Sequence, residues 1–320
     1  MSDTLTEARE FVRGRARRPL FVFGALLLLS VPILAPSQSS LATEALIFGL
    51  FAISVDVVLG YAGLLTLAPA AFFGLGAYSV AKVVVDYGQS FWLGFPVAVV
   101  LAIVMAVIVG YVPIKRRIGD VYFVLFTLAF GAIAYDFTFV TTSVTGGSDG
   151  LGFFSPPDVF GLDLGGSTPY YYFTLLVVAV FGIGLYVLIK SDYGDVLQAT
   201  RQNELRMRYL GYDTNRELMI AWVVSAVVSA LAGAVYVGSI GIASPSLISF
   251  ALTGDVIIWI IVGGTGTLLG PFAAAIGLVF MQEVLQSIWL EGYRLLLGLL
   301  FVIFVFALPD GIMGFIRGKE

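Results

Sequence analysis

The residues in this sequence that are best suited to chemistry are five acids inside or at the ends of apolar runs. They are Glu44, Asp56, Asp136, Asp255 and Glu283. An ionisable side chain at membrane depth is costly, so contact with a substrate or an ion is its first explanation. Glu44, Asp136 and Asp255 lie near the ends of their runs, where interfacial water solvates them. For Asp56 and Glu283, which lie deeper, structural hydrogen bonding inside a helix bundle is favoured over contact with a substrate or an ion.

No catalytic set is visible beside these acids. The chain has neither His nor Cys, which excludes thiol catalysis and disulfides and removes the commonest general base and metal ligand. The GxGxxG and P-loop patterns are missing, so we expect no nucleotide phosphate site. The sequence therefore predicts a chain that is not an enzyme and that has no cofactor and no metal site.

The apolar runs predict the fold class. Of the 320 residues, 59% are hydrophobic and 12% are charged, whereas about 25% of the residues of a soluble domain are charged. Runs long enough to span a bilayer predict an all-α polytopic membrane protein with about ten membrane segments. The expected segments are 20–36, 41–60, 63–84, 92–113, 120–141, 170–189, 218–238, 254–268, 270–289 and 294–310. We expect the third and the eighth of these to be broken or short.

The basic residues predict the orientation. Lys and Arg gather within 9–18, 115–117, 190–216 and 317–319. An even number of expected segments separates each cluster from the next, so all four can face the cytoplasm at once.

This parity predicts the following organisation of the chain. A transmembrane domain, 20–314, lies between two cytoplasmic tails, 1–19 and 315–320, so both termini are cytoplasmic. Residues 190–217 form a cytoplasmic segment. Residues 142–169, rich in Gly, Pro and Ser, form an extracytoplasmic loop of turns rather than a domain. The first apolar run is expected to be a retained helix and not a cleaved signal peptide.

Two interrupted apolar segments predict where a pathway lies. "GLLTLAPAAFFGLGAY" (63–78) and "GTGTLLGPFAAAIGLVF" (264–280) share a Thr-Leu pair, a proline and small residues. Paired, interrupted segments in two halves indicate an inverted repeat with broken helices. In lipid the freed backbone groups are tolerated only where protein or a water-filled cavity satisfies them. The residues predicted to line the pathway are Asp56, Thr66, Pro69, Phe73, Thr265 and Pro271. The alternative is a helix kinked by proline for packing.

Six segments of the sequence together resemble one known family. They are "GYAGLLTLAPAAFFGLGAY" (60–78), "GDVYFVLFTLAFG" (119–131), "TGGSDGL" (145–151), "YGDVLQATRQNELRMRYLGYDTNR" (193–216), "GGTGTLLGP" (263–271) and "LPDGIMG" (308–314). In this order they resemble the permease subunits of branched-chain amino acid ABC transporters, a family that includes urea and short-amide permeases. The resemblance covers most of the chain from about residue 42 to residue 314.

The resemblance gives the cytoplasmic segment a role. By itself, 194–209 reads as a short connecting helix that ends near Gly211. The resemblance implies instead a coupling helix that docks into a cytoplasmic ATPase subunit, so that ATP-driven closure of the partners favours one of two permease states. The positions that match the family's recurring residues are Gly194, Ala199, Arg201, Glu204 and Gly211.

The resemblance also implies partners in a cell membrane. They are a second related permease, two ATP-binding cassette subunits, an extracytoplasmic solute-binding protein and membrane lipid, with no nucleic acid. The loop Gly146–Gly150 either borders the pathway, contacts the binding protein or is a plain set of surface turns.

Two departures from the family leave the cargo open. The family usually has a histidine at the position of Pro69 and an asparagine at that of Asp56. A carboxylate suits a cationic or amide group better than the carboxylate of an amino acid. The expected solute is therefore a branched-chain or other amino acid, urea or an amide. The rival functions are an ion-coupled secondary transporter and a passive channel, neither of which needs 190–217 as an ATPase dock.

Overall fold

The computed structural model of the chain describes residues 30–32, 35–116, 119–152, 158–159, 162–289, 292–307 and 311–317. The predicted tail 1–19 and most of the expected segment 20–36 lie outside these residues. All that follows refers to the described part of the chain.

The bundle is built from long apolar helices. They are α2 (Ser39–Asp56), α3 (Pro69–Val85), α4 (Phe91–Arg116), α5 (Asp120–Val140), α7 (Ser167–Lys190), α10 (Thr214–Ile240), α11 (Phe250–Gly263), α12 (Leu269–Ile288) and α13 (Tyr293–Ala307), followed by the short α14 (Gly311–Arg317). A 3-10 turn, η1 (Pro36–Gln38), leads into α2, and a π-helical turn, η2 (Val57–Tyr61), continues it. This architecture confirms the all-α prediction.

Six of the described helical stretches are long and apolar enough to cross a membrane. They are Pro36–Tyr61, Phe91–Arg116, Val121–Val140, Ser167–Lys190, Thr214–Ile240 and Leu269–Ile288. Three shorter apolar helices, Pro69–Val85, Phe250–Gly263 and Leu295–Phe304, fall in the other expected segments. The chain is therefore a multi-pass membrane protein, and the two segments expected to be broken or short are among the short ones.

The first expected break lies before a helix and not inside it. Residues 62–68 form no helix, and α3 begins at Pro69. Proline fits the first helical position because its missing amide hydrogen has no partner there in any helix. The alternative of a helix kinked at this proline is therefore wrong, and the expected span 63–84 was too long at its start.

The second break has the same form. α11 ends at Gly263, residues 264–268 form no helix, and α12 begins at Leu269. Gly264 has a φ of 103°, a backbone conformation that glycine adopts at little cost. The expected span 254–268 was wrong at both ends, because it began inside α11 and included this turn.

The core lies around α2 and α10. Within the membrane-length windows, 89% of the residues of α2 and 72% of those of α10 are buried, against 17% for α5. α3 and α10 approach so closely that a β-carbon on Gly76 would overlap the carbonyl of Ala230, and one on Gly233 would overlap that of Phe73. Small residues at such crossings let membrane helices pack without polar contacts.

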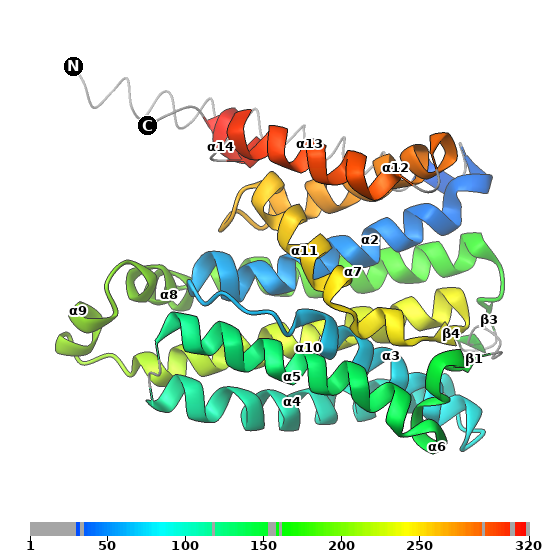
Figure 1. The fold of residues 1–320 in the computed structure, drawn as a ribbon, viewed down its shortest axis with the longest axis horizontal. Helices are drawn as coiled ribbons and strands as arrows, with labels where there is room; N and C mark the ends of the chain where they lie inside the picture. The colour runs from blue at the N-terminus through cyan, green and yellow to red at the C-terminus, as the bar shows by residue number, and fades with distance from the viewer. Residues whose placement is uncertain are drawn as a thin grey trace.

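Polar elements occupy the two opposite ends of the bundle (Figure 1). At one end lie α8 (Asp192–Gln202) and α9 (Glu204–Tyr209). At the other end lie α6 (Thr142–Thr145), followed by η3 (Gly147–Asp149), and short strands. The largely buried 3-10 turn η4 (Pro245–Ile248) leads from there into α11. Strand β1 (Leu151–Gly152) pairs antiparallel with β4 (Ile242–Ala243), and β2 (Asp158–Val159) with β3 (Leu162–Asp163). The described part of 142–169 contains α6, η3, the short strands β1, β2 and β3, and the first residues of α7.

Candidate functional site

One arginine joins the polar helix α8 to the first break of the bundle. Arg201 Nη1 donates a hydrogen bond to the carbonyl oxygen of Gly60, in the π-helical turn η2. Its aliphatic stem lies against Gly63, because a β-carbon on Gly63 would be 2.6 Å from Arg201 Cγ. Gly63 has a φ of 75°, so both its conformation and its contact favour glycine.

One aspartate joins the end of α2 to the second break. Asp56 is fully buried. Its Oδ1 accepts a hydrogen bond of 2.8 Å from the amide of Gly266, and its Oδ2 accepts one of 3.2 Å from the amide of Leu268. These bonds satisfy backbone donors that the non-helical turn 264–268 cannot pair within itself. The Arg201 guanidinium also has a favourable electrostatic interaction with the Asp56 carboxylate.

These contacts bring three distant parts of the chain into one place, which we call the junction. It comprises Asp56, Gly60, Arg201, Gly266 and Leu268. A β-carbon on Gly60 would overlap both Asp56 Oδ1 and the amide nitrogen of Gly266, so η2 and the second break touch through backbone. The junction therefore places Arg201 of α8 beside both non-helical turns.

The other residues predicted to line a pathway are mostly packed inside protein. Thr66 is buried and accepts a hydrogen bond of 3.2 Å from the amide of Ala68. Phe73 is fully buried in a cluster with Phe48, Phe51 and Tyr236. Pro69 and Pro271 are buried in the first turns of α3 and α12, and Thr265 is exposed. A pathway role for these residues stays a prediction.

Most of the residues predicted for coupling have their contacts or special backbone conformations inside the polar segment 190–217. Gly194 is buried where α7 turns into α8, and a β-carbon there would overlap the carbonyl of Ile189. Glu204 Oε1 accepts a hydrogen bond of 2.9 Å from the Thr214 hydroxyl. Gly211, with a φ of 92°, reverses the chain after α9, and Ala199 is half-buried.

The single helix expected over 194–209 is in fact two helices. Asn203 separates α8 from α9, and its side chain accepts a hydrogen bond of 2.9 Å from the amide of Arg206. Asparagine favours this N-cap position because its short side chain reaches the free amides of the first turn. α8 is also tied to α10, since the Tyr193 hydroxyl donates to the carbonyl of Glu217 over 2.8 Å. Burial raises the pKa of Tyr193, which keeps this donor protonated.

The outer face of the polar segment carries large apolar side chains. Leu205, Tyr209 and Leu210 are 57%, 84% and 65% exposed, and Tyr212 lies close by in sequence and is also exposed. We call these four residues the outer patch. Large exposed apolar side chains on an element that projects from the bundle are candidates for a contact with another protein. The sequence analysis missed Tyr209 and Tyr212, although two tyrosines in a charged segment were a usable signal.

A polar cavity of about 350 Å³ lies between α2, α10, α11 and α12. Three of the five acids noted in the sequence line it, namely Glu44, Asp255 and Glu283, together with Gln282 and Gln286. We call it the acidic cavity. Its wall includes the buried Tyr236, whose hydroxyl donates to Glu44 Oε1 over 3.1 Å.

Sequence position alone did not reveal the acidic cavity. Glu44 and Asp255 were explained as interfacial residues, but the fold brings them to the same wall as Glu283. None of the six predicted pathway residues is among the described residues that line it. The pattern Gln282, Glu283, Gln286 in an apolar helix was the signal that could have pointed to it.

Comparison with known proteins gives consistent results. The family model "branched-chain amino acid transport system / permease component" matches residues 37–305. The high-affinity branched-chain amino acid transport system permease protein LivM of Escherichia coli (strain K12) is 28% identical over 92% of this chain and 74% of its own length. The ribose import permease protein RbsC of Haemophilus influenzae is 26% identical over 74% of this chain and 73% of its own length. No solved structure matches.

The family match covers far more than half of the chain and agrees with the six segments that carry the resemblance in the sequence. In this family the permease is the membrane subunit, and ATP is hydrolysed on separate subunits. The chain therefore belongs to the family of branched-chain amino acid transport system permease components, as a non-catalytic membrane subunit of an ABC importer.

Proposed function

We propose that this chain forms part of the route of a small polar solute and that ATPase subunits drive it through α8 and α9. The observation that carries the proposal is the junction. Arg201 holds the carbonyl of Gly60, and Asp56 holds the amides of Gly266 and Leu268. A displacement of α8 therefore acts on both non-helical turns at once.

The mechanism follows from this linkage. A partner that binds one position of α8 more tightly than another shifts the permease between two states by that difference in binding free energy. The turns at 62–68 and 264–268 are the elements that respond, because neither forms a helix. ATP closes the partner subunits, the partners move α8, and the junction passes the movement into the bundle.

The placement of the polar ends supports the topology that we propose. α8 and α9, within 190–217, face the cytoplasm with both termini, and the turns within 142–169 face the opposite side and the solute-binding protein. The complete importer contains a second related permease and two ATP-binding cassette subunits. The paired arrangement of α2, turn and α3 with α11, turn and α12 supports an inverted repeat of about ten segments.

The acidic cavity is the part of the route that we propose selects the solute. Its carboxylates attract a positive group, and Gln282 and Gln286 offer amide hydrogen bonds. A solute with an ammonium or amide group fits this wall. Such solutes include branched-chain and other amino acids, urea and amides. The argument for such a solute thus rests on Glu44, Asp255 and Glu283 and not on Asp56, whose oxygens are taken by backbone amides.

The carboxylates of the acidic cavity also fit one rival function. Carboxylates in a membrane cavity also suit an ion-coupled secondary transporter. Such a transporter has no use for the outer patch on α9 as a dock. The two functions are separated by whether uptake requires ATP and the ATPase subunits.

The outer patch gives a direct test of ATPase docking. Tyr209→Asp is expected to lower co-purification of the ATPase subunits at least about tenfold, because a central apolar contact contributes about 2 kcal/mol or more to binding. Tyr209→Phe, which keeps the ring, is the matched control and should assemble normally. Equal recovery of the ATPase with Tyr209→Asp and with the parent would contradict docking at this face.

The acidic cavity gives a test of the solute route. Asp255→Asn and Glu44→Gln are each expected to raise the KM for a solute with an ammonium group about tenfold, since a hydrogen bond to a charged group contributes roughly 1.5–3 kcal/mol. The measurement is uptake into liposomes that contain the complete transporter. Asp136→Asn, an exposed acid of α5 outside this cavity, is the control. A KM for the cavity variants equal to that of the control would rule this route out.

A further inference from the structure

A second, much larger hollow of about 860 Å³ lies between α3, α4 and α5. Its wall is almost entirely apolar and includes Leu75, Leu101, Ile133 and Phe137. Several of these side chains are exposed, so the hollow is a groove that opens outward between α4 and α5. Both helices have membrane length. The groove therefore runs along two helices of membrane length, and its apolar wall calls for an apolar occupant.

Two polar groups enter this apolar groove from α3. Tyr78 is only 9% exposed, and its hydroxyl has no hydrogen-bond partner among the described residues. A buried hydroxyl without a partner costs about 1–3 kcal/mol, so a ligand that supplies an acceptor stabilises this site. Lys82 lies one helical turn further on, which is about 6 Å along the axis, and it also lines the groove.

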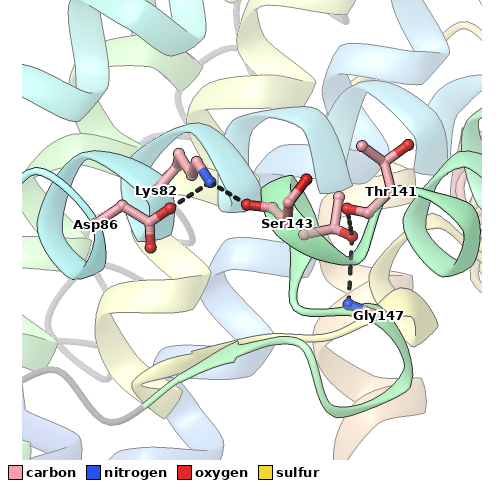
Figure 2. A network of polar contacts seen from close by, with 6 residues as sticks. Lys82, Asp86, Thr141, Ser143 and Gly147 are labelled. Atoms are coloured by element: carbon pink, nitrogen blue, oxygen red, sulfur yellow. Dashed lines mark hydrogen bonds and ion pairs between the residues drawn. The ribbon is translucent and has the colours of Figure 1, made fainter.

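The Lys82 end of the groove is preformed by a polar network (Figure 2). The Lys82 ammonium contacts Asp86 and donates a hydrogen bond of 2.9 Å to the carbonyl of Ser143, in α6. The Thr145 hydroxyl bonds the carbonyl of Thr138, in α5, over 2.6 Å. α6 is thereby fixed between α3 and α5, and its residues Val144 and Thr145 complete the groove wall.

We propose that this groove binds a glycerophospholipid, with its phosphate at Lys82, an ester carbonyl at the Tyr78 hydroxyl and an acyl chain along the apolar wall. The groups follow one another along the groove in the order of the matching parts of the lipid. The Lys82 cation matches the phosphate, the Tyr78 hydroxyl matches the ester carbonyl, and the apolar wall matches the acyl chain. A small polar solute does not fit a wall that offers so few polar partners. A helix of another subunit fills apolar space, but its carbonyls already accept bonds within their own helix and leave Tyr78 unpaired.

The first experiment measures lipid retained by the intact transporter. The complete complex is purified in mild detergent, delipidated and titrated with phosphatidylglycerol, and bound lipid is counted by native mass spectrometry. Tyr78→Phe is expected to weaken binding at the strongest site about threefold or more, the effect of one hydrogen bond. Ala134→Trp, which fills the groove, is expected to remove that site. Leu176→Trp, on the exposed face of α7, is the control.

The result that overturns the proposal is equal phosphatidylglycerol binding in Tyr78→Phe and in the control. This variant removes one oxygen atom, so its outcome decides the matter even where Ala134→Trp does not fold. A second measurement identifies the occupant. The chain has no cysteine, so Ile133→Cys places a single photoreactive label in the groove. Labelling of lipid supports the proposal, and capture of the second permease subunit overturns it.

Discussion

Replacing Arg201 with alanine should leave the ATPase subunits bound and yet reduce ATP-driven uptake about tenfold or more. The sequence resemblance predicts Arg201 as a residue of the docking segment. In the structure its guanidinium instead points back to the carbonyl of Gly60 and interacts with the Asp56 carboxylate. A hydrogen bond from a charged group contributes roughly 1.5–3 kcal/mol, and this bond joins α8 to the breaks. Without this bond, movement of α8 should no longer be transmitted to the bundle.

The measurement has two parts, co-purification of the ATPase subunits and uptake into liposomes by the assembled complex. Arg201→Lys keeps the charge but loses the planar group that reaches two acceptors, so it should retain more uptake than Arg201→Ala. Uptake at the parental level in Arg201→Ala would contradict the role of the junction. Release of the ATPase subunits from Arg201→Ala would show that Arg201 is a docking residue and not a link.

The second large effect is expected at Asp56 and concerns stability. Asp56→Ala removes the acceptor of the Gly266 and Leu268 amides, and each buried amide left without a partner costs about 1–3 kcal/mol. The purified protein should therefore unfold at a temperature about 5 °C or more lower. Circular dichroism or intrinsic fluorescence during heating in detergent measures this shift.

Asp56→Asn separates a structural role from a role in solute contact. An amide oxygen still accepts one of the two hydrogen bonds, and the related family usually carries asparagine at this position. We expect this variant to be more stable than Asp56→Ala and to keep its preference among solutes. A normally stable Asp56→Asn protein with a changed solute preference would place Asp56 on the route and contradict its assignment to the junction.

The sequence alone was sufficient to predict the features that depend on residues close together in the chain. Apolar runs predicted the helices, and Pro69 and Pro271 marked the two interrupted segments. The exact bounds were not predicted, because hydropathy does not distinguish a helix from the apolar, non-helical stretch 62–68. Asn203 was a readable N-cap signal in hindsight, since its side chain ends one short helix and starts the next.

The features that depend on tertiary packing could not be predicted in this way. Nothing in the sequence pairs Arg201 with Gly60, which are 141 positions apart. Glu44 and Asp255 looked interfacial because their depth was judged along single helices, whereas the cavity is formed by several. Tyr209 of α9 was overlooked because the resemblance directed attention to other positions, most of which lie outside α9.

One reconstitution tests the central claim most directly. Liposomes are prepared with both permease subunits, with and without the ATPase subunits, and solute uptake is measured with the solute-binding protein and ATP supplied. The account predicts uptake only when the ATPase subunits and ATP are both present. Full uptake by the permease subunits alone, without ATP, would contradict it and favour an ion-coupled transporter or a channel.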